Sequence, residues 1–248
     1  MKRLLENSNR TLIGGHRGCF CRYQENTLKA MEEGITRGAD YLEIDLQYTK
    51  DNQIVIFHDT CLEGKLQLSG STMDYTLEEL RKQTEINTLD EVLAWGRRNA
   101  IYFGLELKEI PVIMHGKIMK LLPALVDCIK KYDMLQNVFV FGADYKVLKA
   151  IKAMENNISI GIIVPFVPHN PVALMEEMDA IIYISYVYNL TGDIVKNLQS
   201  HGYYVDGSTL KTKQCMDLAV SLGVNMIEVD DPCEWKEFLP NRKVKVGV

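Results

Sequence analysis

The segment Tyr41–His58, YLEIDLQYTKDNQIVIFH, decides the fold of this 248-residue chain. Apolar and polar residues alternate along its first seven positions, which predicts a strand with Glu43 and Asp45 on one face, roughly 7 Å apart. The next apolar run, at 54–57, follows too soon for a parallel crossover, so we expect it to return antiparallel through a turn. That hairpin brings His58 back beside the two carboxylates.

Similar apolar runs continue along the whole chain. They lie near residues 12–16, 41–47, 54–57, 102–107, 138–141, 159–164, 180–185, 203–206 and 226–229. Without the hairpin strand eight runs remain, and strand followed by helix eight times predicts an α/β fold, a (β/α)8 TIM barrel with a β-hairpin after strand 2. We expect residues 1–248 to form a single domain.

Helical segments with capping residues separate the predicted strands. We expect Asn26 to be the N-cap of a helix that runs to about residue 37, and Thr88 to be the N-cap of a helix from 89 to 99. Further helices are expected at 114–132, 144–154, 171–178, 192–201 and 211–222. About residues 60–87 form a small insertion before the next helix. Because it follows the strand that carries His58, it is either a lid over the barrel mouth or a packed loop with one helical turn near 77–82.

Composition excludes several classes of function. The formal net charge is −5 with both signs interspersed, which argues against a nucleic-acid partner. No apolar stretch approaches the length of a membrane span, so we expect no stable membrane insertion. The N-terminus lacks an apolar signal core, which favours a cytoplasmic location and six reduced cysteines. The sequence leaves the oligomeric state open.

The chemistry-bearing residues fall at the carboxyl ends of predicted strands, where TIM barrels place their sites. Glu106 and Lys108 repeat the alternation of Glu43 and Asp45, so all four face inward. Three carboxylates with Lys108 and Arg17 sum to −3 + 2 = −1, and a divalent cation brings the site to +1. Oxygen ligands favour one hard cation, Mg2+ or Ca2+.

A phosphodiester suits such a site. Arg17 can clamp phosphate oxygens with its planar fork, and Lys108 adds a point charge. Hydrolysis also needs a base for the attacking hydroxyl and an acid for the leaving alkoxide. His16 and His58 titrate near neutral pH and are the candidates, in either order.

In these residues the chain resembles the glycerophosphodiester phosphodiesterase family. The resemblance rests on motifs in the same order and spacing: GGHRG at 14–18, ENTLKA at 25–30, GADYLEIDLQYTKD at 38–51, IVIFHD at 54–59, TLDEVL at 88–93 and LELK at 105–108. It implies a TIM-type barrel that hydrolyses glycerophosphodiesters to sn-glycerol 3-phosphate and an alcohol. It also implies Glu43, Asp45 and Glu106 as metal ligands and His16 and His58 as catalytic residues.

The sequence departs from that family near its end. Relatives typically carry a Trp-Thr-Val-Asn-like run in the seventh barrel strand, where this chain has YYVDGST at 203–209 without Trp. That Trp is expected to line the glycerol pocket, so the departure leaves two alternatives open. One is a lysophospholipase D-like hydrolase of single-chain lipids, and the other is a barrel that binds glycerophosphodiesters without turning them over.

Overall fold

The computed structural model describes residues 1–108 and 112–236. Within them the nine predicted strands are confirmed. They are β1 (Leu12–Gly15), β2 (Tyr41–Tyr48), β3 (Ile54–Ile56), β4 (Phe103–Leu107), β5 (Val138–Gly142), β6 (Ser159–Ile163), β7 (Ile182–Ser185), β8 (Tyr204–Gly207) and β9 (Met226–Val229).

Eight of these strands close into a parallel barrel. The neighbours run β1-β2-β4-β5-β6-β7-β8-β9, and β9 pairs again with β1. The strand β3 lies outside this ring and pairs antiparallel with the end of β2, with Gln47 opposite Val55. The TIM barrel and the hairpin after strand 2 are therefore confirmed.

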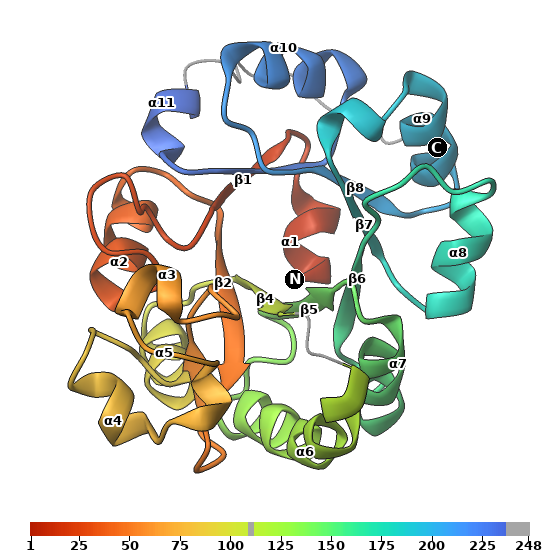
Figure 1. Ribbon diagram of the computed structural model, residues 1–248. Helices are drawn as coiled ribbons and strands as arrows, with labels where there is room; N and C mark the ends of the chain where they lie inside the picture. The colour runs from red at the N-terminus through yellow and green to blue at the C-terminus, as the bar shows by residue number, and fades with distance from the viewer. Residues whose placement is uncertain (109–111, 237–248) are drawn as a thin grey trace.

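Helices follow the barrel strands and form an outer ring (Figure 1). They are α2 (Leu28–Thr36), α5 (Leu89–Arg98), α6 (His115–Lys131), α7 (Tyr145–Met154), α8 (Pro171–Met178), α9 (Gly192–Ser200), α10 (Lys213–Leu222) and α11 (Pro232–Lys236). Short 3-10 turns η2 (Val112–Met114) and η3 (Val187–Asn189) precede α6 and α9. Thr88 caps α5 as predicted, through a capping box with Glu91.

The prediction that Asn26 is the N-cap of the helix after β1 is wrong. Thr27 caps α2, because its side chain accepts a hydrogen bond from the backbone N–H of Ala30. Asn26 instead adopts a left-handed conformation, with φ 61°, and turns its amide toward the barrel. Asn26 and Thr27 are adjacent and both can cap a helix, so the sequence alone did not show which of them is the N-cap.

An N-terminal helix that was not predicted, α1 (Lys2–Asn7), closes one end of the barrel. Met1 and Leu5 pack against the first residues of several strands, including Leu12, Tyr41 and Met226. In projection α1 lies inside the ring of strands (Figure 1). The amino end of the barrel is therefore filled by apolar side chains, and only the carboxyl end is left for a site.

The predicted insertion holds three short elements, α3 (Glu63–Leu66), η1 (Thr72–Asp74) and α4 (Leu77–Arg81). They have a small core of their own, made by Val55, Phe57, Leu62, Leu80 and Ile86. The insertion is thus a packed structure with a helical turn where one was expected.

Among the residues described, no helix combines the length and apolar character needed to cross a membrane.

Candidate active site

Three carboxylates meet at the carboxyl end of the barrel. Glu43 and Asp45 project inward from β2, and Glu106 projects from β4, where it lies in register with Asp45. One ligand oxygen from each of the three lies within 4.8 Å of the others. Glu43 and Asp45 are each only 1% exposed. Strand alternation and parallel pairing therefore bring together the residues that the sequence marked as one group.

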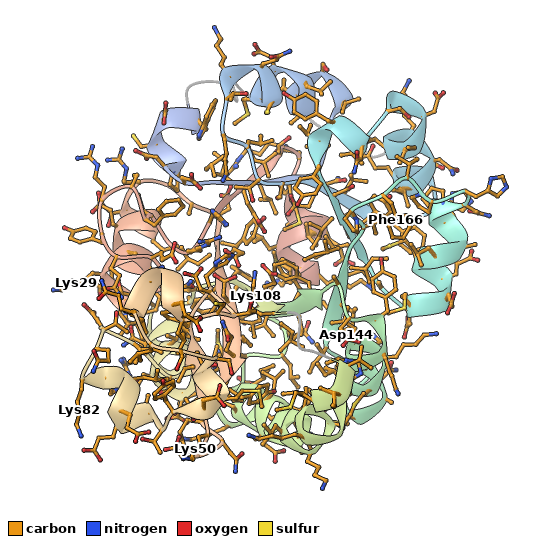
Figure 2. All side chains as sticks on the ribbon, in the orientation of Figure 1. Lys29, Lys50, Lys82, Lys108, Asp144 and Phe166 are labelled. Carbon is orange, nitrogen blue, oxygen red and sulfur yellow. The ribbon has the colours of Figure 1, made fainter. Side chains whose placement is uncertain are left out.

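Two fixed cations lie against these carboxylates. Lys108 Nζ is 2.9 Å from Glu106 Oε1 and 3.3 Å from Asp45 Oδ1. Arg17 Nε is 3.5 Å from Asp45 Oδ2 on the other side. Lys108 lies near the middle of the ring of helices (Figure 2). Both predicted phosphate-binding residues are thus within reach of anything bound to the carboxylates.

The turn after β1 shapes the position of Arg17. Arg17 has φ 53°, and its backbone N–H donates a 2.9 Å hydrogen bond to Glu43 Oε2. Its guanidinium Nη1 donates a 2.8 Å bond to Glu25. Glu25 also binds Lys65 from the insertion, so α3 reaches the site through this carboxylate. Backbone and side chain of Arg17 are both fixed before any ligand arrives.

Asn26 belongs to the site through Asp45. Its amide Nδ2 donates a 2.7 Å bond to Asp45 Oδ2, and its Oδ1 accepts a 3.3 Å bond from the backbone N–H of Asp45. Asn26 is only 3% exposed. The residue read as a helix cap therefore orients a predicted metal ligand instead.

Each candidate catalytic histidine is held by its own carboxylate. His16 Nδ1 lies 2.8 Å from Asp230 Oδ1, and His58 Nδ1 lies 2.6 Å from Asp59 Oδ1. His58 is grouped with Asp59 and Glu25, whose ligand atoms lie within 4.8 Å of one another, rather than with the three carboxylates. Its charge nonetheless helps to lower the pKa of Asp45. In both pairs the carboxylate occupies Nδ1, which leaves Nε2 for a substrate.

Burial and mutual repulsion set the charge states. Burial, then Asp45 and Glu106, raise the pKa of Glu43 well above its ordinary value. Burial and the nearby Asp45 raise the pKa of Glu106 to about 7. Burial also pushes the pKa of Asp45 upward, but Lys108, Arg17 and His58 outweigh it, and the pKa ends below its ordinary value. The nearby positive charges therefore favour the ionised form of Asp45, whereas Glu43 and Glu106 bind a proton more readily than usual.

The unmet hydrogen-bonding capacity of this group fits a cation. Glu43 Oε1 and Asp45 Oδ1 are buried and accept no hydrogen bond. Lys108 faces Asp45 Oδ1 as an ion pair at 3.3 Å, but a buried carboxylate oxygen that accepts no hydrogen bond is still costly. Oxygen-only donors in a tight group suit a hard divalent ion and not a thiophilic one. The chemistry of the donor set therefore agrees with the predicted Mg2+ or Ca2+.

A second acidic pair, which was not predicted to be part of the site, lies in the barrel interior. Asp206 on β8 is fully buried and accepts hydrogen bonds from the hydroxyls of Tyr41, at 3.0 Å, and Ser208. Glu228 on β9 is 4% exposed, and its Oε1 has no partner. Burial raises the pKa of Asp206 to about 6 and the pKa of Glu228 well above its ordinary value. The only sequence signal was an acid after an apolar residue in each strand, Val205 before Asp206 and Ile227 before Glu228.

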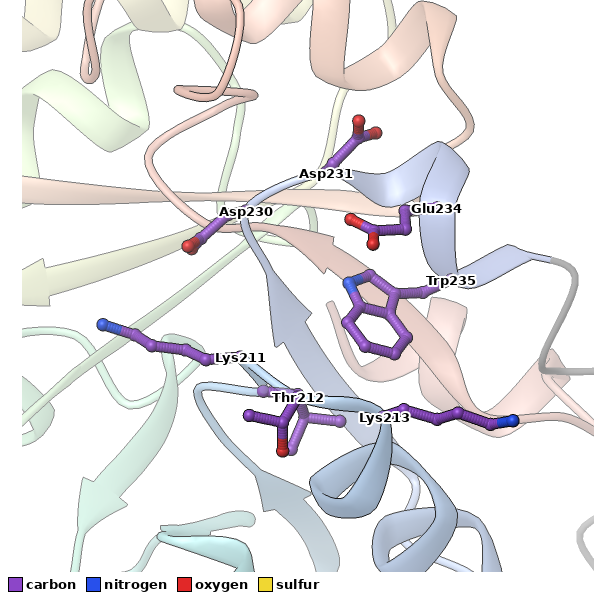
Figure 3. A pocket seen from close by; sticks show the side chains of 8 residues that line it. Lys211, Thr212, Lys213, Asp230, Asp231, Glu234 and Trp235 are labelled. Carbon is purple, nitrogen blue, oxygen red and sulfur yellow. The ribbon is translucent and has the colours of Figure 1, made fainter.

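Asp230 also forms part of a pocket beside the site. The pocket measures about 350 Å³ and is lined by Leu210, Lys211, Thr212, Lys213, Asp230, Asp231, Glu234 and Trp235. The carboxylate of Asp230 and the ammonium group of Lys211 point to the same side, away from Trp235 (Figure 3). The mouth of the barrel is therefore charged where β8 and β9 end.

Comparison with known proteins agrees with this geometry. The sequence model of the glycerophosphoryl diester phosphodiesterase family matches residues 16–234. A glycerophosphodiester phosphodiesterase of Caldanaerobacter subterraneus subsp. tengcongensis is 27% identical over 90% of this chain and 95% of its own length. A human lysophospholipase D is 21% identical over 94% of this chain and 86% of its own.

Solved structures share the fold. A phosphodiesterase of Oleispira antarctica, determined in complex with the product sn-glycerol-3-phosphate, superposes with a TM-score of 0.80 at 22% identity, over 92% of this chain and 96% of that one. At that identity the likeness speaks for the barrel alone. The family match covers nearly the whole described chain, including every predicted site residue. The chain therefore belongs to the glycerophosphoryl diester phosphodiesterase family and is a phosphoric diester hydrolase.

Proposed function

We propose that this enzyme hydrolyses glycerophosphodiesters to sn-glycerol 3-phosphate and an alcohol, with the help of one divalent cation. One observation carries the proposal. One ligand oxygen from each of three carboxylates lies within 4.8 Å of the others, two of their buried oxygens accept no hydrogen bond, and Arg17 and Lys108 lie against them. Such a site offers positive charge to a phosphodiester monoanion only when a cation is present. A relative with bound sn-glycerol-3-phosphate supports the same product.

In this proposal Glu43, Asp45 and Glu106 hold Mg2+ or Ca2+. When bound, the cation supplies a Lewis acid that polarises a non-bridging phosphoryl oxygen. Arg17 clamps phosphate oxygens from the side of β1, since Glu43 and Glu25 fix its backbone and guanidinium. Lys108 neutralises the negative charge that develops on the equatorial oxygens.

His16 and His58 exchange the protons. With Nδ1 of each ring facing a carboxylate, Asp230 or Asp59, the neutral ring keeps Nε2 free to accept a proton. The charged ring is stabilised by the same carboxylate and can donate that proton. One histidine thus deprotonates the attacking hydroxyl, of water or of the adjacent glycerol, and the other protonates the leaving alkoxide.

We also propose that residues 1–248 act as one domain and that the insertion at about 60–87 is part of its site. Lys65 supports this, because it binds the same Glu25 that positions Arg17. The insertion would then contact the alcohol part of the substrate.

The reaction is tested by incubating purified protein with glycerophosphocholine and measuring sn-glycerol 3-phosphate and choline separately. Equal release of both is expected. Release of phosphocholine instead would place the cut on the other ester bond, and no release would contradict the proposed substrate.

A second candidate function, hydrolysis of lysophospholipids, is favoured by the apolar side of the mouth. Of the eight exposed large apolar residues among those described, seven lie in segments between a barrel strand and the α-helix that follows it: Tyr23, Val112, Ile113, Phe166, Val167, Tyr186 and Tyr188. Met154, at the end of α7, is the exception. The loops 164–170 and 186–191 contain no Asp, Glu, Lys or Arg. Asn189 binds the Pro165 carbonyl at 3.1 Å and joins them into one surface.

An acyl chain on the glycerol of the substrate could lie across this surface. Its contribution is tested with monomeric lysophosphatidylcholines of increasing chain length. Each buried methylene raises kcat/KM by up to about fourfold. The double variant Phe166→Ser with Tyr188→Ser should lose that dependence, whereas Met154→Ser should keep it. A wild-type rate that does not rise with chain length would rule out this second candidate.

A further inference from the structure

In the part of the chain that the structure describes, three buried carboxylate oxygens accept no hydrogen bond: Glu43 Oε1, Asp45 Oδ1 and Glu228 Oε1. The first two belong to the proposed cation site. The third comes from β9, on the other side of β1. An ionised carboxylate buried without a partner is unfavourable by several kcal/mol in general terms, so its presence calls for a compensating group.

The strand pattern points Glu228 into the barrel. Its neighbours Ile227 and Val229 pack into the core outside the strands, and Met226, two residues earlier, packs in the inner apolar layer. Glu228 therefore faces inward with Met226. It lies in register with Gly14 on β1, and Gly14 lies in register with Tyr41 on β2. Because Gly14 has no side chain, the ring of Tyr41 occupies the space beside it, so the inward side chain of Glu228 lies in the same layer of the barrel as Tyr41.

Electrostatics place Glu228 within range of the cation site. After burial and Asp206, the charges of Glu43, Glu106 and Asp45 each raise the pKa of Glu228. All three proposed ligands thus repel its negative charge. The same arrangement becomes favourable when a divalent cation lies among those ligands, because the cation attracts Glu228 from the same direction.

The neighbouring Asp206 shows that burial alone does not explain Glu228. Asp206 is equally buried, but Tyr41 binds its Oδ2 and Ser208 binds its Oδ1. Both of its oxygens are therefore satisfied inside the protein. Glu228 Oε1, by contrast, accepts no hydrogen bond from the described protein and can accept one from a bound water.

We propose that Glu228 is a fourth carboxylate of the cation centre, acting through Oε1 on a water bound to the cation. The role is an outer one, because Glu228 is not in the group of ligand atoms within 4.8 Å of one another. It rests on the cation site of the proposed function. Partners of this kind orient bound water and add attraction, and their loss typically lowers metal affinity about 10–100-fold.

The test is calorimetric titration of the metal-free protein with Mg2+ and with Ca2+, which needs no substrate. Glu228→Gln keeps the shape and removes the charge, and we expect its affinity to fall about 10–100-fold. Asp206→Asn is the matched control, since it neutralises a buried acid of the same pair whose oxygens are already bonded. Its affinity should stay within about threefold of the wild type.

Thermal unfolding of the metal-free proteins provides the second readout. Glu228→Gln removes repulsion among buried acids, so its metal-free form should melt above the wild type while its cation-dependent rise in Tm shrinks. Glu228→Met serves if the glutamine variant does not fold. Unchanged cation affinity in the Glu228 variant, or an equal loss in Asp206→Asn, would overturn the proposal.

The variant Glu43→Gln distinguishes a wrong role for Glu228 from a wrong assignment of the cation site itself. If Glu43→Gln loses cation binding and Glu228→Gln does not, only the role of Glu228 is wrong. If Glu43→Gln binds cations as the wild type does, the proposed cation site itself is wrong.

Discussion

Asn26 Nδ2 donates a 2.7 Å hydrogen bond to Asp45 Oδ2, and both residues are buried. The bond connects the turn after β1 with the carboxylate at the centre of the site. Asp45 also faces Arg17 and Lys108, so its orientation decides how three elements of the site meet.

Replacing Asn26 by Ala removes this constraint. We expect divalent-cation affinity to fall about 10–100-fold, as for other residues that orient a metal ligand. Stability should fall by about 1–3 kcal/mol, because a buried carboxylate oxygen loses its donor. Thr27→Ala is the control: it removes the N-cap of α2, costs about 1 kcal/mol and leaves cation affinity unchanged. Calorimetry and urea unfolding measure both quantities, and equal cation affinity in the two variants would contradict the role of Asn26.

Gly18 fixes the turn that carries Arg17. It has φ 90°, and a Cβ there would lie 2.6 Å from the backbone carbon of Ala30. Gly18→Ala should therefore cost at least about 1–3 kcal/mol and displace Arg17. Gly64→Ala, in the helix α3 with open space around it, should instead stabilise by about 0.5–1 kcal/mol. Denaturant unfolding compares the pair, and a Gly18→Ala protein as stable as the wild type would show that the turn tolerates a side chain.

The histidine roles predict a selective loss of turnover. His16→Ala and His58→Ala should each lower kcat about 10²–10⁴-fold, because each removes one proton transfer. Cation affinity should change little, since neither ring is among the proposed ligands. His201→Ala is the control, as that ring binds the Asn197 carbonyl of its own helix. Full hydrolysis by His16→Ala would show that its assignment as acid or base is wrong.

Cation binding should strengthen as pH rises. The raised pKa of Glu106, about 7, means that the metal-free folded protein keeps a proton that the unfolded chain loses near the ordinary value of 4.5. Between these values the metal-free fold therefore loses stability with rising pH. A bound cation requires the ionised form, so its affinity should rise up to about tenfold per pH unit across the same window. Calorimetry at several pH values checks this, and Glu106→Gln should flatten the profile; an unchanged slope in that variant would assign the proton to another group.

Local pattern was enough to predict much of the fold and the first group of acids. Glu43 and Asp45 alternate along one strand, and the short link to the next run forces the hairpin that ends in His58. Glu106 on β4 and Lys108, directly after the end of β4, obey the same period of two. Because these relationships depend on strand geometry and parallel pairing, the residues fell where the sequence indicated.

Contacts that depend on closure of the barrel could not be predicted in this way. Asp230 reaches His16 from a position 214 residues away, and only the pairing of β9 with β1 brings them together. Glu228 enters the interior by the same pairing. Asn26 was misassigned for a different reason, since capping and ligand orientation use the same side-chain amide and only the left-handed turn distinguishes them.

The most direct test of the account is sn-glycerol 3-phosphate release from glycerophosphocholine in EDTA, and again after excess Mg2+ or Ca2+ is restored. The wild type should be inactive in EDTA and recover with the cation, and Glu43→Gln should stay inactive in both conditions. Full-rate release by the wild type in EDTA would contradict a cation-dependent mechanism and leave the three carboxylates without their proposed role.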